Sequence, residues 1–310
     1  MKNKTSVGPF LIMAASSLWA IDALFRTQLT FSIAPASIIF IEHLIGFIIL
    51  SPVFVKHVQE IKKFTAHTWV VLLAMTIVSS VAGTLMFTQA LSMSFAEQDF
   101  VTPILLQKLQ PVFVVGLSAL FLKERIDMKF FVLSVLALIG SYMISFGTTI
   151  VPFTLQNKEI VFLLALGAAV AWGSGTILSK TLLEKVSFPF ATALRFLCAI
   201  PVAFVASYLF HQTVTLDQLG FQELWRFIVI AGITGGAGAL FLYYKGLQKT
   251  QAKVSTFAEL MFPVVSIFIA VTPLNPYGAP QMLSVENMVG IVLLIGSILL
   301  ISGENRKGTI

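Results

Sequence analysis

Charged residues and cysteine are both scarce in this chain of 310 residues. Charged residues make up 11% of it, whereas a soluble domain has about 25%. The one cysteine, Cys198, lies inside an apolar run, which excludes a disulfide within the chain and a thiolate metal site. The sequence also has no His/Asp cluster with metal-ligand spacing and no Ser/His pair at membrane depth. These absences argue against an enzyme and against a metal or other cofactor.

A nucleotide-binding motif is missing as well. Residues 235–238 read Gly-Gly-Ala-Gly, but no strand precedes this run and no Lys-Ser/Thr follows it, so it lacks the parts that make a phosphate-binding loop. We therefore predict no nucleotide partner. Any work that this protein performs must draw on a solute or ion gradient.

Apolar residues dominate the chain, at 57% with a mean hydropathy of +0.93. Each of ten apolar runs is close to the roughly 20 residues that a helix needs to cross a bilayer. The first run is expected to be a retained helix rather than a cleaved signal peptide, because of its length and the nine runs that follow. We predict an all-α integral membrane protein with ten transmembrane helices and no soluble domain. The runs span 7–27, 34–55, 69–91, 100–122, 129–148, 160–183, 189–210, 225–247, 254–273 and 286–303.

The distribution of Lys and Arg predicts how these helices are oriented. With the N-terminus inside, fifteen of the twenty basic residues fall in cytoplasmic segments, and only Arg26, Lys158 and Arg226 fall outside. Cytoplasmic loops are enriched in Lys and Arg. We therefore predict a plasma (inner) membrane protein with both termini in the cytoplasm, whose lipid partner is the bilayer. The net charge of +6 then reflects topology and does not indicate a nucleic-acid partner.

The two halves of the chain repeat each other at nearly constant spacing. We predict one five-helix unit at 7–148, a second at 160–303, and a linker at 149–159. Because five is odd, the second unit must enter the membrane from the opposite side, as in carriers that expose one central site to either face in turn. The first half carries Trp19, Pro35, Glu42, Trp69, Ala90-Leu91 and Pro111, and the second half carries Trp172, Pro189, Arg195, Trp225, Gly246-Leu247 and Pro263 in the same order.

Five short stretches resemble a known family: residues 87–91 (FTQAL), 105–113 (LLQKLQPVF) and 120–125 (LFLKER), with 243–247 (YYKGL) and 263–265 (PVV) in the second half. They are similar to the drug/metabolite transporter superfamily, in its EamA-like branch. The resemblance covers essentially the whole chain. It implies a ten-helix, five-plus-five inverted-repeat fold of the inner membrane, which exports small metabolites or amino acids by a proton- or gradient-coupled mechanism. The second half lacks a counterpart of residues 123–125, and 91–111 is about four residues longer than 247–263.

Four ionisable residues lie deep inside the apolar runs. Such residues are costly in hydrocarbon and are candidates for function. Glu42 and Lys108 each lie eight residues into a helix that enters from outside, about 12 Å deep, and Arg195 and Glu259 share a depth on the cytoplasmic side. We therefore predict one pair between Glu42 and Lys108 and another between Arg195 and Glu259. The alternative is that both pairs only lock helices together, because breaking a buried pair is costly in either case.

Asp22 is a further deep acid, three residues after Trp19 and four before Arg26, so that all three share a face of the first helix. An acid near the outer end is a candidate to take and release a proton, the predicted coupling ion. The alternative is a surface pair with Arg26 at the water boundary.

Polar residues and prolines in the fourth and ninth runs are predicted to line a cavity. Gln107 and Gln110 flank Lys108, and Pro111 leaves a backbone carbonyl one turn earlier without its donor. Such groups are tolerated at membrane depth only where they face protein or a wet cavity. Pro103 and Pro111 bracket a predicted kink and gate, and Pro263, four residues after Glu259, repeats the arrangement.

Three aromatic residues complete the candidate site: Trp19, Trp172 and Tyr243. The two tryptophans are repeat equivalents inside the first and sixth runs. Aromatic rings can pack against an apolar or cationic cargo, but they also serve as bundle core or as interface anchors. The sequence leaves both interpretations open.

The function predicted from the sequence is secondary active transport of a small-molecule substrate by alternating access. A cavity with both signs of charge suits a zwitterion, so the predicted cargo is an amino acid or a related metabolite, and the predicted direction is export. The alternatives are an exporter of multiple drugs or cationic compounds, and a membrane accessory protein that transports nothing.

Overall fold

The computed structural model describes residues 7–96, 103, 106–150, 159–213, 219–275 and 279–304. Across these ranges every regular element is a helix, and no strand is present. Nine of the helical stretches there are long and apolar enough to cross a membrane, and a shorter apolar helix covers Gln110–Phe121. The predicted fourth span, 100–122, lies partly outside the described residues. The prediction of an all-helical, multi-pass membrane protein is confirmed.

The first half contains three long helices and several shorter ones. Pro35 occupies the first turn of its helix, where the missing N–H of proline costs nothing, and the Asp127 side chain caps another helix by accepting from the Phe130 N–H at 2.8 Å. The elements are α1 (Val7–Leu29), α2 (Pro35–His57), the 3-10 helix η1 (Val58–Lys63), α3 (Ala66–Met75), the π-helix η2 (Thr76–Gly83), α4 (Thr84–Ala96), α6 (Gln110–Phe121) and α7 (Met128–Phe146).

The second half follows the same order, with long helices at its beginning and end and interrupted ones between them. Its elements are α8 (Glu159–Leu183), α9 (Phe188–Leu209), α10 (Phe221–Val229), the π-helix η4 (Ile230–Thr234), α11 (Ala237–Leu247), α12 (Ala252–Ala258), α13 (Met261–Ala270) and α14 (Val285–Glu304).

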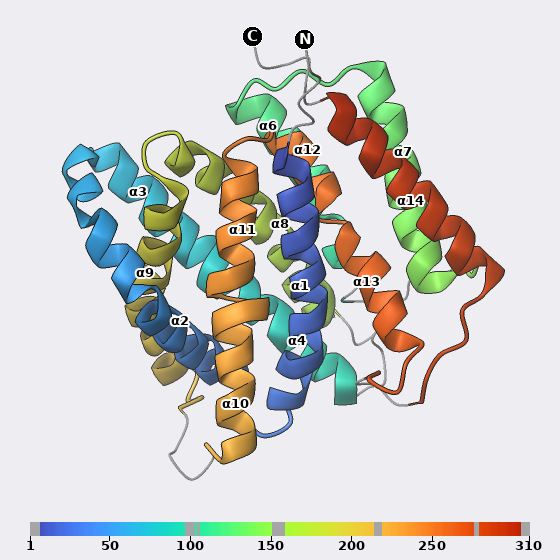
Figure 1. The fold of residues 1–310 in the computed structure, drawn as a ribbon. Coiled ribbons are helices and arrows are strands. Elements are labelled where there is room, and N and C mark those ends of the chain that lie inside the picture. Colours follow the sequence, from blue (N-terminus) through green and yellow to red (C-terminus); the bar gives the residue numbers. More distant parts are fainter. Residues whose placement is uncertain are drawn as a thin grey trace.

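Helices of one half pack mainly against helices of the other half. The most extensive contacts join α2 to α9, α7 to α14, and α1 to α11, while α8 packs along α3, η2 and α4. Figure 1 shows α7 and α14 side by side at one edge of the bundle, with α2, α3 and α9 at the other. The site described below is therefore built from both halves.

The two faces of the bundle can be named from the helix ends. The N-face carries the start of α1 and the end of α14 (Figure 1), and it includes the turn after α11, because Gly8 packs against Thr250. The opposite face carries the end of α1 and the starts of α2 and α10. Large apolar side chains are exposed around the bundle, for example Phe131 at 56% and Val292 at 74%. Such a surface suits a lipid environment.

Both halves interrupt their third helix with a π-helical segment, where the sequence predicts continuous helices at 69–91 and 225–247. In η4 the N–H groups of Gly235 and Gly236 both bond the Ile230 carbonyl, at 2.9 and 2.6 Å. In η2 the hydroxyl-bearing residues Ser79 and Ser80 are buried. Single π-turns inside helices are frequent at functional sites.

Close packing of α7 on α14 rests on glycine, and this gives a first prediction. A Cβ at Gly290 would lie 2.9 Å from the Gly140 carbonyl oxygen, whereas a Cβ at Gly296 on the same helix meets nothing within 4 Å. We expect Gly290→Val to lower the free energy of unfolding by about 1–3 kcal/mol through overpacking. Thermal unfolding in detergent measures this, and Gly296→Val is the matched control. Equal melting temperatures for the two variants would contradict the packing.

Candidate functional site

The helices that contain Lys108 and Glu259 are each interrupted at that residue. Turns at 108–109 and 259–260 separate α6 and α13 from the helical residues before them. Pro111 and Pro263 then lie in the first turns of α6 and α13. Helices broken in this way are where carriers build their solute sites.

Pro263 explains one contact of the second break. A helical residue at 263 would donate its N–H to the Glu259 carbonyl, but proline has none. That carbonyl accepts instead from the Phe262 N–H at 3.0 Å and from the Ser16 hydroxyl of α1. The break thus ties α1 to the α12–α13 turn.

The Glu259 side chain is held by neutral donors from both halves. The Tyr243 hydroxyl of α11 donates to Oε1 at 2.8 Å, and Gln110 Nε2 of α6 donates to Oε2 at 3.1 Å. Gln107 in turn donates to the Gln110 side-chain carbonyl at 3.3 Å. Within the described residues Glu259 forms no ion pair. The predicted pair between Arg195 and Glu259 is therefore wrong.

Arg195 is held in the same manner, by hydroxyl groups. Its Nε donates to Ser80 Oγ at 2.7 Å and its Nη1 to the Tyr244 hydroxyl at 2.9 Å, with Ser79 Oγ 3.5 Å from Nη2. It forms no ion pair within the described part of the chain. Arg195 and Glu259 thus carry opposite charges but form no ion pair with each other. Burying a charge among neutral groups costs folding free energy.

Two adjacent tyrosines connect these charges. The rings of Tyr243 and Tyr244 lie 6.0 Å apart between centroids. Tyr243 also meets the Thr176 hydroxyl at 3.2 Å, and Tyr244 meets Ser179 Oγ at 3.0 Å, both on α8. Two groups of polar contacts therefore lie side by side, one around Arg195 and Tyr244 and one around Tyr243 and Glu259, and the two tyrosine rings join them. The tyrosines lie on α11 and their hydroxyl partners Thr176 and Ser179 lie on α8.

Each predicted tryptophan packs on an aromatic ring of the other half. Trp19 lies 5.1 Å from Tyr243, and Trp172 lies 5.2 Å from Phe87, between ring centroids. The indole N–H of Trp19 also donates to the Gly235 carbonyl at 3.3 Å. Both tryptophans are half-buried. They contact the interrupted third helices, so the structure places both rings inside the bundle.

A second charged cluster replaces the predicted pair between Glu42 and Lys108. Arg26 Nη2 lies 2.9 Å from Glu42 Oε2, and Arg26 Nε lies 2.7 Å from Asp22 Oδ2. Asp22 Oδ1 accepts from the Thr234 hydroxyl at 3.3 Å. Asp22 is 5% and Glu42 6% exposed. The alternative of an Asp22–Arg26 pair is right about the partners and about their shared helix, but this pair is buried and not at the surface.

Lys108 faces α7 instead. Its Nζ donates to the Ser141 carbonyl at 3.2 Å and to Ser145 Oγ. The sequence placed Lys108 and Glu42 at the same depth in the membrane. Depth alone does not determine which neighbouring helix a side chain contacts. Pro103 is buried, and the residues on either side of it lie outside the described ranges. The predicted gate at Pro103 and Pro111 stays a prediction.

Three residues of the site were not named from the sequence: Ser16, Ser79 and Ser80. One signal could have found the serine pair. Ser79 and Ser80 lie ten and eleven residues after Trp69, as Gly235 and Gly236 do after Trp225. A polar pair at the repeat position of a glycine pair marks a helix interruption. No group of three or more His, Cys, Asp and Glu in the described residues is placed to hold a metal ion.

Two carboxylates, Glu60 and Glu124, cap the first residues of helices at the N-face. Glu60 accepts from the N–H and the hydroxyl of Ser187, at 2.8 and 2.5 Å, and Glu124 accepts from the N–H groups of Ala252 and Lys253, at 2.7 and 2.9 Å. These acids cap α9 and α12, where the helix dipole favours negative charge. On the opposite face the Gln212 side chain accepts from the Ala36 N–H of α2 at 2.9 Å.

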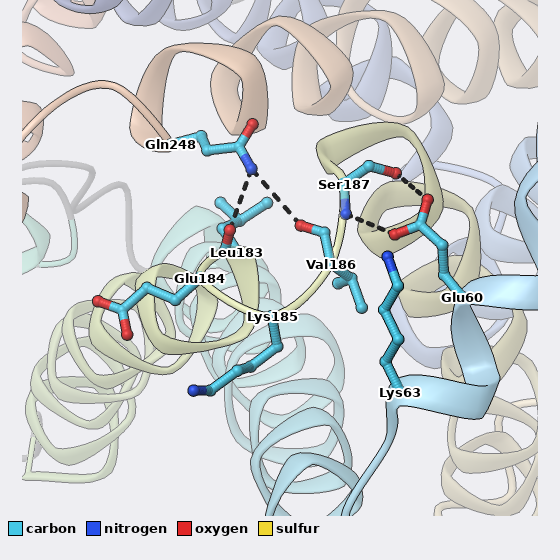
Figure 2. Close-up of a pocket in the computed structure, with 8 residues that line it drawn as sticks. All are labelled: Glu60, Lys63, Leu183, Glu184, Lys185, Val186, Ser187 and Gln248. Carbon is cyan, nitrogen blue, oxygen red and sulfur yellow. Dashed lines mark hydrogen bonds between the residues drawn. The ribbon is translucent and has the colours of Figure 1, made fainter.

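A pocket of about 300 Å³ lies at the N-face, beside the contact between Glu60 and Ser187. Figure 2 shows Glu60 reaching Ser187, and Gln248 reaching the Leu183 and Val186 carbonyls, while Glu184 and Lys185 point away. The pocket is bounded by the α8–α9 turn and η1 and does not include Glu259. The pocket lies among the contacts that join the α8–α9 turn to η1 at this face.

The described residues contain nine long apolar helices, with the Glu259 carboxylate at a helix break, and these features define a multi-pass membrane protein of the transporter class. The model of the EamA-like transporter family matches residues 6–146 and again residues 159–303. The chain belongs to this family, and so to the drug/metabolite transporter superfamily.

Individual proteins are similar over most of the chain. A protein of Fusobacterium nucleatum named riboflavin transporter ImpX is 32% identical over 270 residues, 84% of this chain and 87% of that one. An uncharacterized transporter of Synechocystis is 25% identical, covering 78% of this chain and 68% of its own. A solved crystal structure has a TM-score of 0.74 at 18% identity, with 99% of this chain and 100% of that chain covered. This last likeness supports the fold alone.

The new pairing of Glu42 gives a second prediction. In a double-mutant cycle with Glu42→Gln and Arg26→Gln, we expect a coupling energy of about 0.5–3 kcal/mol, because these side chains are in contact. The cycle with Glu42→Gln and Lys108→Gln is the control, with a coupling near zero. Unfolding in mixed micelles measures both. A larger coupling to Lys108 than to Arg26 would restore the pairing predicted from the sequence.

Proposed function

We propose that this protein is a secondary active transporter that works by alternating access around Glu259 and Arg195. It spans the plasma (inner) membrane with ten helices, in two inverted units at 7–148 and 160–303. Its N-face is cytoplasmic, in keeping with the excess of Lys and Arg in the segments assigned to that side.

Matching contacts between the halves support the inverted repeat. Trp19 packs on Tyr243 and Trp172 packs on Phe87, and each residue of the first pair has its repeat equivalent in the second. The cap that Glu60 supplies to α9 likewise has a counterpart on the opposite face, where Gln212 caps α2. Contacts that repeat about a pseudo-two-fold axis are what a rocking mechanism requires.

The observation that carries the proposal is the pair of unneutralised charges. Glu259 and Arg195 bond only neutral groups among the described residues, and Tyr243 and Tyr244 lie between them. The hydroxyl and amide groups that bond Glu259 and Arg195 can turn to a cargo, and the two charged groups can then bond the cargo as well. No ion pair has to be broken for this exchange. A static lock would instead join the opposite charges directly.

For the cargo we propose a neutral aromatic heterocycle of the flavin type. The similarity to a named riboflavin transporter, at 32% identity over most of both chains, supports this class. The half-buried rings of Trp19 and Trp172 offer faces for a planar ring system. Gln110, Tyr243 and Glu259 offer hydrogen bonds to carbonyl, imide and hydroxyl groups.

A second candidate is the amino acid. Arg195 and Glu259 could bind the carboxylate and the ammonium of a zwitterion, one at each end of the tyrosine pair. A cationic drug would use Glu259 alone and would gain nothing from Arg195. Export stays the proposed direction.

A counterflow experiment tests the function and gives a third prediction. Purified protein in proteoliposomes preloaded with riboflavin should take up labelled riboflavin saturably. Glu259→Gln should lower the rate at least about tenfold, because a hydrogen bond to a charged group contributes about 1.5–3 kcal/mol. Glu184→Gln, an exposed acid at the N-face, is the control and should leave the rate unchanged.

The same vesicles separate the alternatives. Saturable exchange of labelled amino acids that is lost in Arg195→Gln, with no riboflavin exchange, would replace the flavin proposal. Exchange of cationic compounds alone would favour the drug exporter. If no solute of this panel moves, an accessory role without transport stands. Export is tested by comparing right-side-out and inside-out vesicles.

A further inference from the structure

A buried charge cluster lies apart from Glu259 and is not used by the proposed cargo site. It consists of Asp22, Arg26 and Glu42, on α1 and α2. One guanidinium is shared by two carboxylates, at 2.7 and 2.9 Å, so one negative charge is left in excess. Arg26 Nη1 is buried without a hydrogen-bond partner in the described residues. A structural lock would need only one acid, because an unmatched buried charge costs several kcal/mol.

The surroundings of Asp22 leave room for a proton but not for a metal ion. One of its oxygens bonds Arg26, and the other accepts from Thr234. Gly235 packs so closely that a Cβ there would lie 2.3 Å from Asp22 Oδ1. A metal cation needs several further oxygen ligands, whereas a proton needs one carboxylate oxygen.

The other charged and titratable groups around Asp22 have partners of their own. His43 of α2 bonds the Ile39 carbonyl through Nδ1 at 2.7 Å, and Tyr243 of α11 donates to Glu259 at the α12–α13 turn. Arg226 of α10 lies 3.8 Å from Glu223. The element η4, Ile230–Thr234, has no ionisable residue. The excess charge therefore rests on the two carboxylates.

We propose that the Asp22–Arg26–Glu42 cluster is the coupling site of this transporter and binds one proton, on Asp22. The proposal rests on the proposed transport function and adds the ion and its site. Protonation cancels the excess charge, and Arg26 keeps Glu42 as its partner. Deprotonation restores the charge and the bond to Asp22.

The π-segment η4 links the proton site to the cargo site. Asp22 contacts Thr234 and Gly235, at the end of this π-segment. The Gly235 carbonyl accepts from Trp19, and Trp19 packs on Tyr243, which donates to Glu259. Asp22 and Trp19 thus both contact the end of η4. The helices α1, α2 and α10 lie together beside this segment (Figure 1).

Transport driven by a pH gradient gives the fourth prediction. One coupled proton lets a gradient of one pH unit, worth about 1.4 kcal/mol, drive roughly tenfold accumulation of a neutral cargo. We therefore expect the ratio of riboflavin accumulation with and without the gradient to be about ten in the wild type and about one in Asp22→Asn. This ratio does not depend on the amount of active protein.

Two further variants serve as a second test and as a control. Glu42→Gln also removes the excess charge and should bring the ratio to about one, so the proposal stays testable if Asp22→Asn does not fold. Glu223→Gln, in the long contact with Arg226, is the matched control and should keep the wild-type ratio. A ratio that is unchanged in both Asp22→Asn and Glu42→Gln overturns the proposal.

Infrared titration of purified protein in nanodiscs tests the proton site without any cargo. The wild type should show a component of the protonated-carboxyl band that grows as pH falls, is lost in Asp22→Asn and is kept in Glu223→Gln. If this band is present while no solute is exchanged, the transport proposal fails and the proton site stands. If exchange occurs while the band is the same in Asp22→Asn as in the wild type, the proton site fails alone.

Discussion

The Glu259 carboxylate is the constraint on which the arrangement of the site depends. A buried charge must be solvated by the protein, and here the donors are Tyr243 and Gln110, from helices of different halves. Meeting this demand fixes the α12–α13 turn against α6 and α11. The Ser16 hydroxyl adds α1, because Pro263 has no N–H for the Glu259 carbonyl, which accepts from Ser16 and from the Phe262 N–H. The turn between α12 and α13 thus contacts α1, α6 and α11, the helices that form the site with it.

The two halves use the same scaffold for different charges. Asp22 lies against Gly235 at the end of η4, and its repeat equivalent Gly175 lies against Ser79 in η2. The acid is present in the first half alone, so the first copy holds two carboxylates around Arg26. The second copy presents Arg195 to hydroxyl groups instead. The two ends of the transporter are built alike, and their electrostatics differ.

Hydropathy was sufficient to predict the nine long apolar helices that the described residues contain, because a bilayer demands runs of one length. It could not predict η2 and η4, since a π-turn leaves composition unchanged. Counting residues placed Glu42 and Lys108 at one depth, but rotation about each helix axis decides contacts, and Lys108 faces α7. The sequence placed Asp22 and Arg26 on one face of the first helix, but it could not show that Glu42 of α2 shares this arginine. The proline positions correctly indicated that the Glu259 carbonyl lacks the donor four residues on, because that effect is local, but the sequence did not show that the Phe262 N–H and the Ser16 hydroxyl bond it instead.

Paired distance measurements test alternating access most directly. Spin labels at 62 and 185 report on the N-face, and labels at 31 and 221 report on the opposite face; all four side chains are exposed. Each pair joins the two halves. When cargo is added or pH is changed, we expect one distance distribution to shorten while the other lengthens. Distances that stay fixed, or that change in the same sense at both faces, would contradict a rocking carrier.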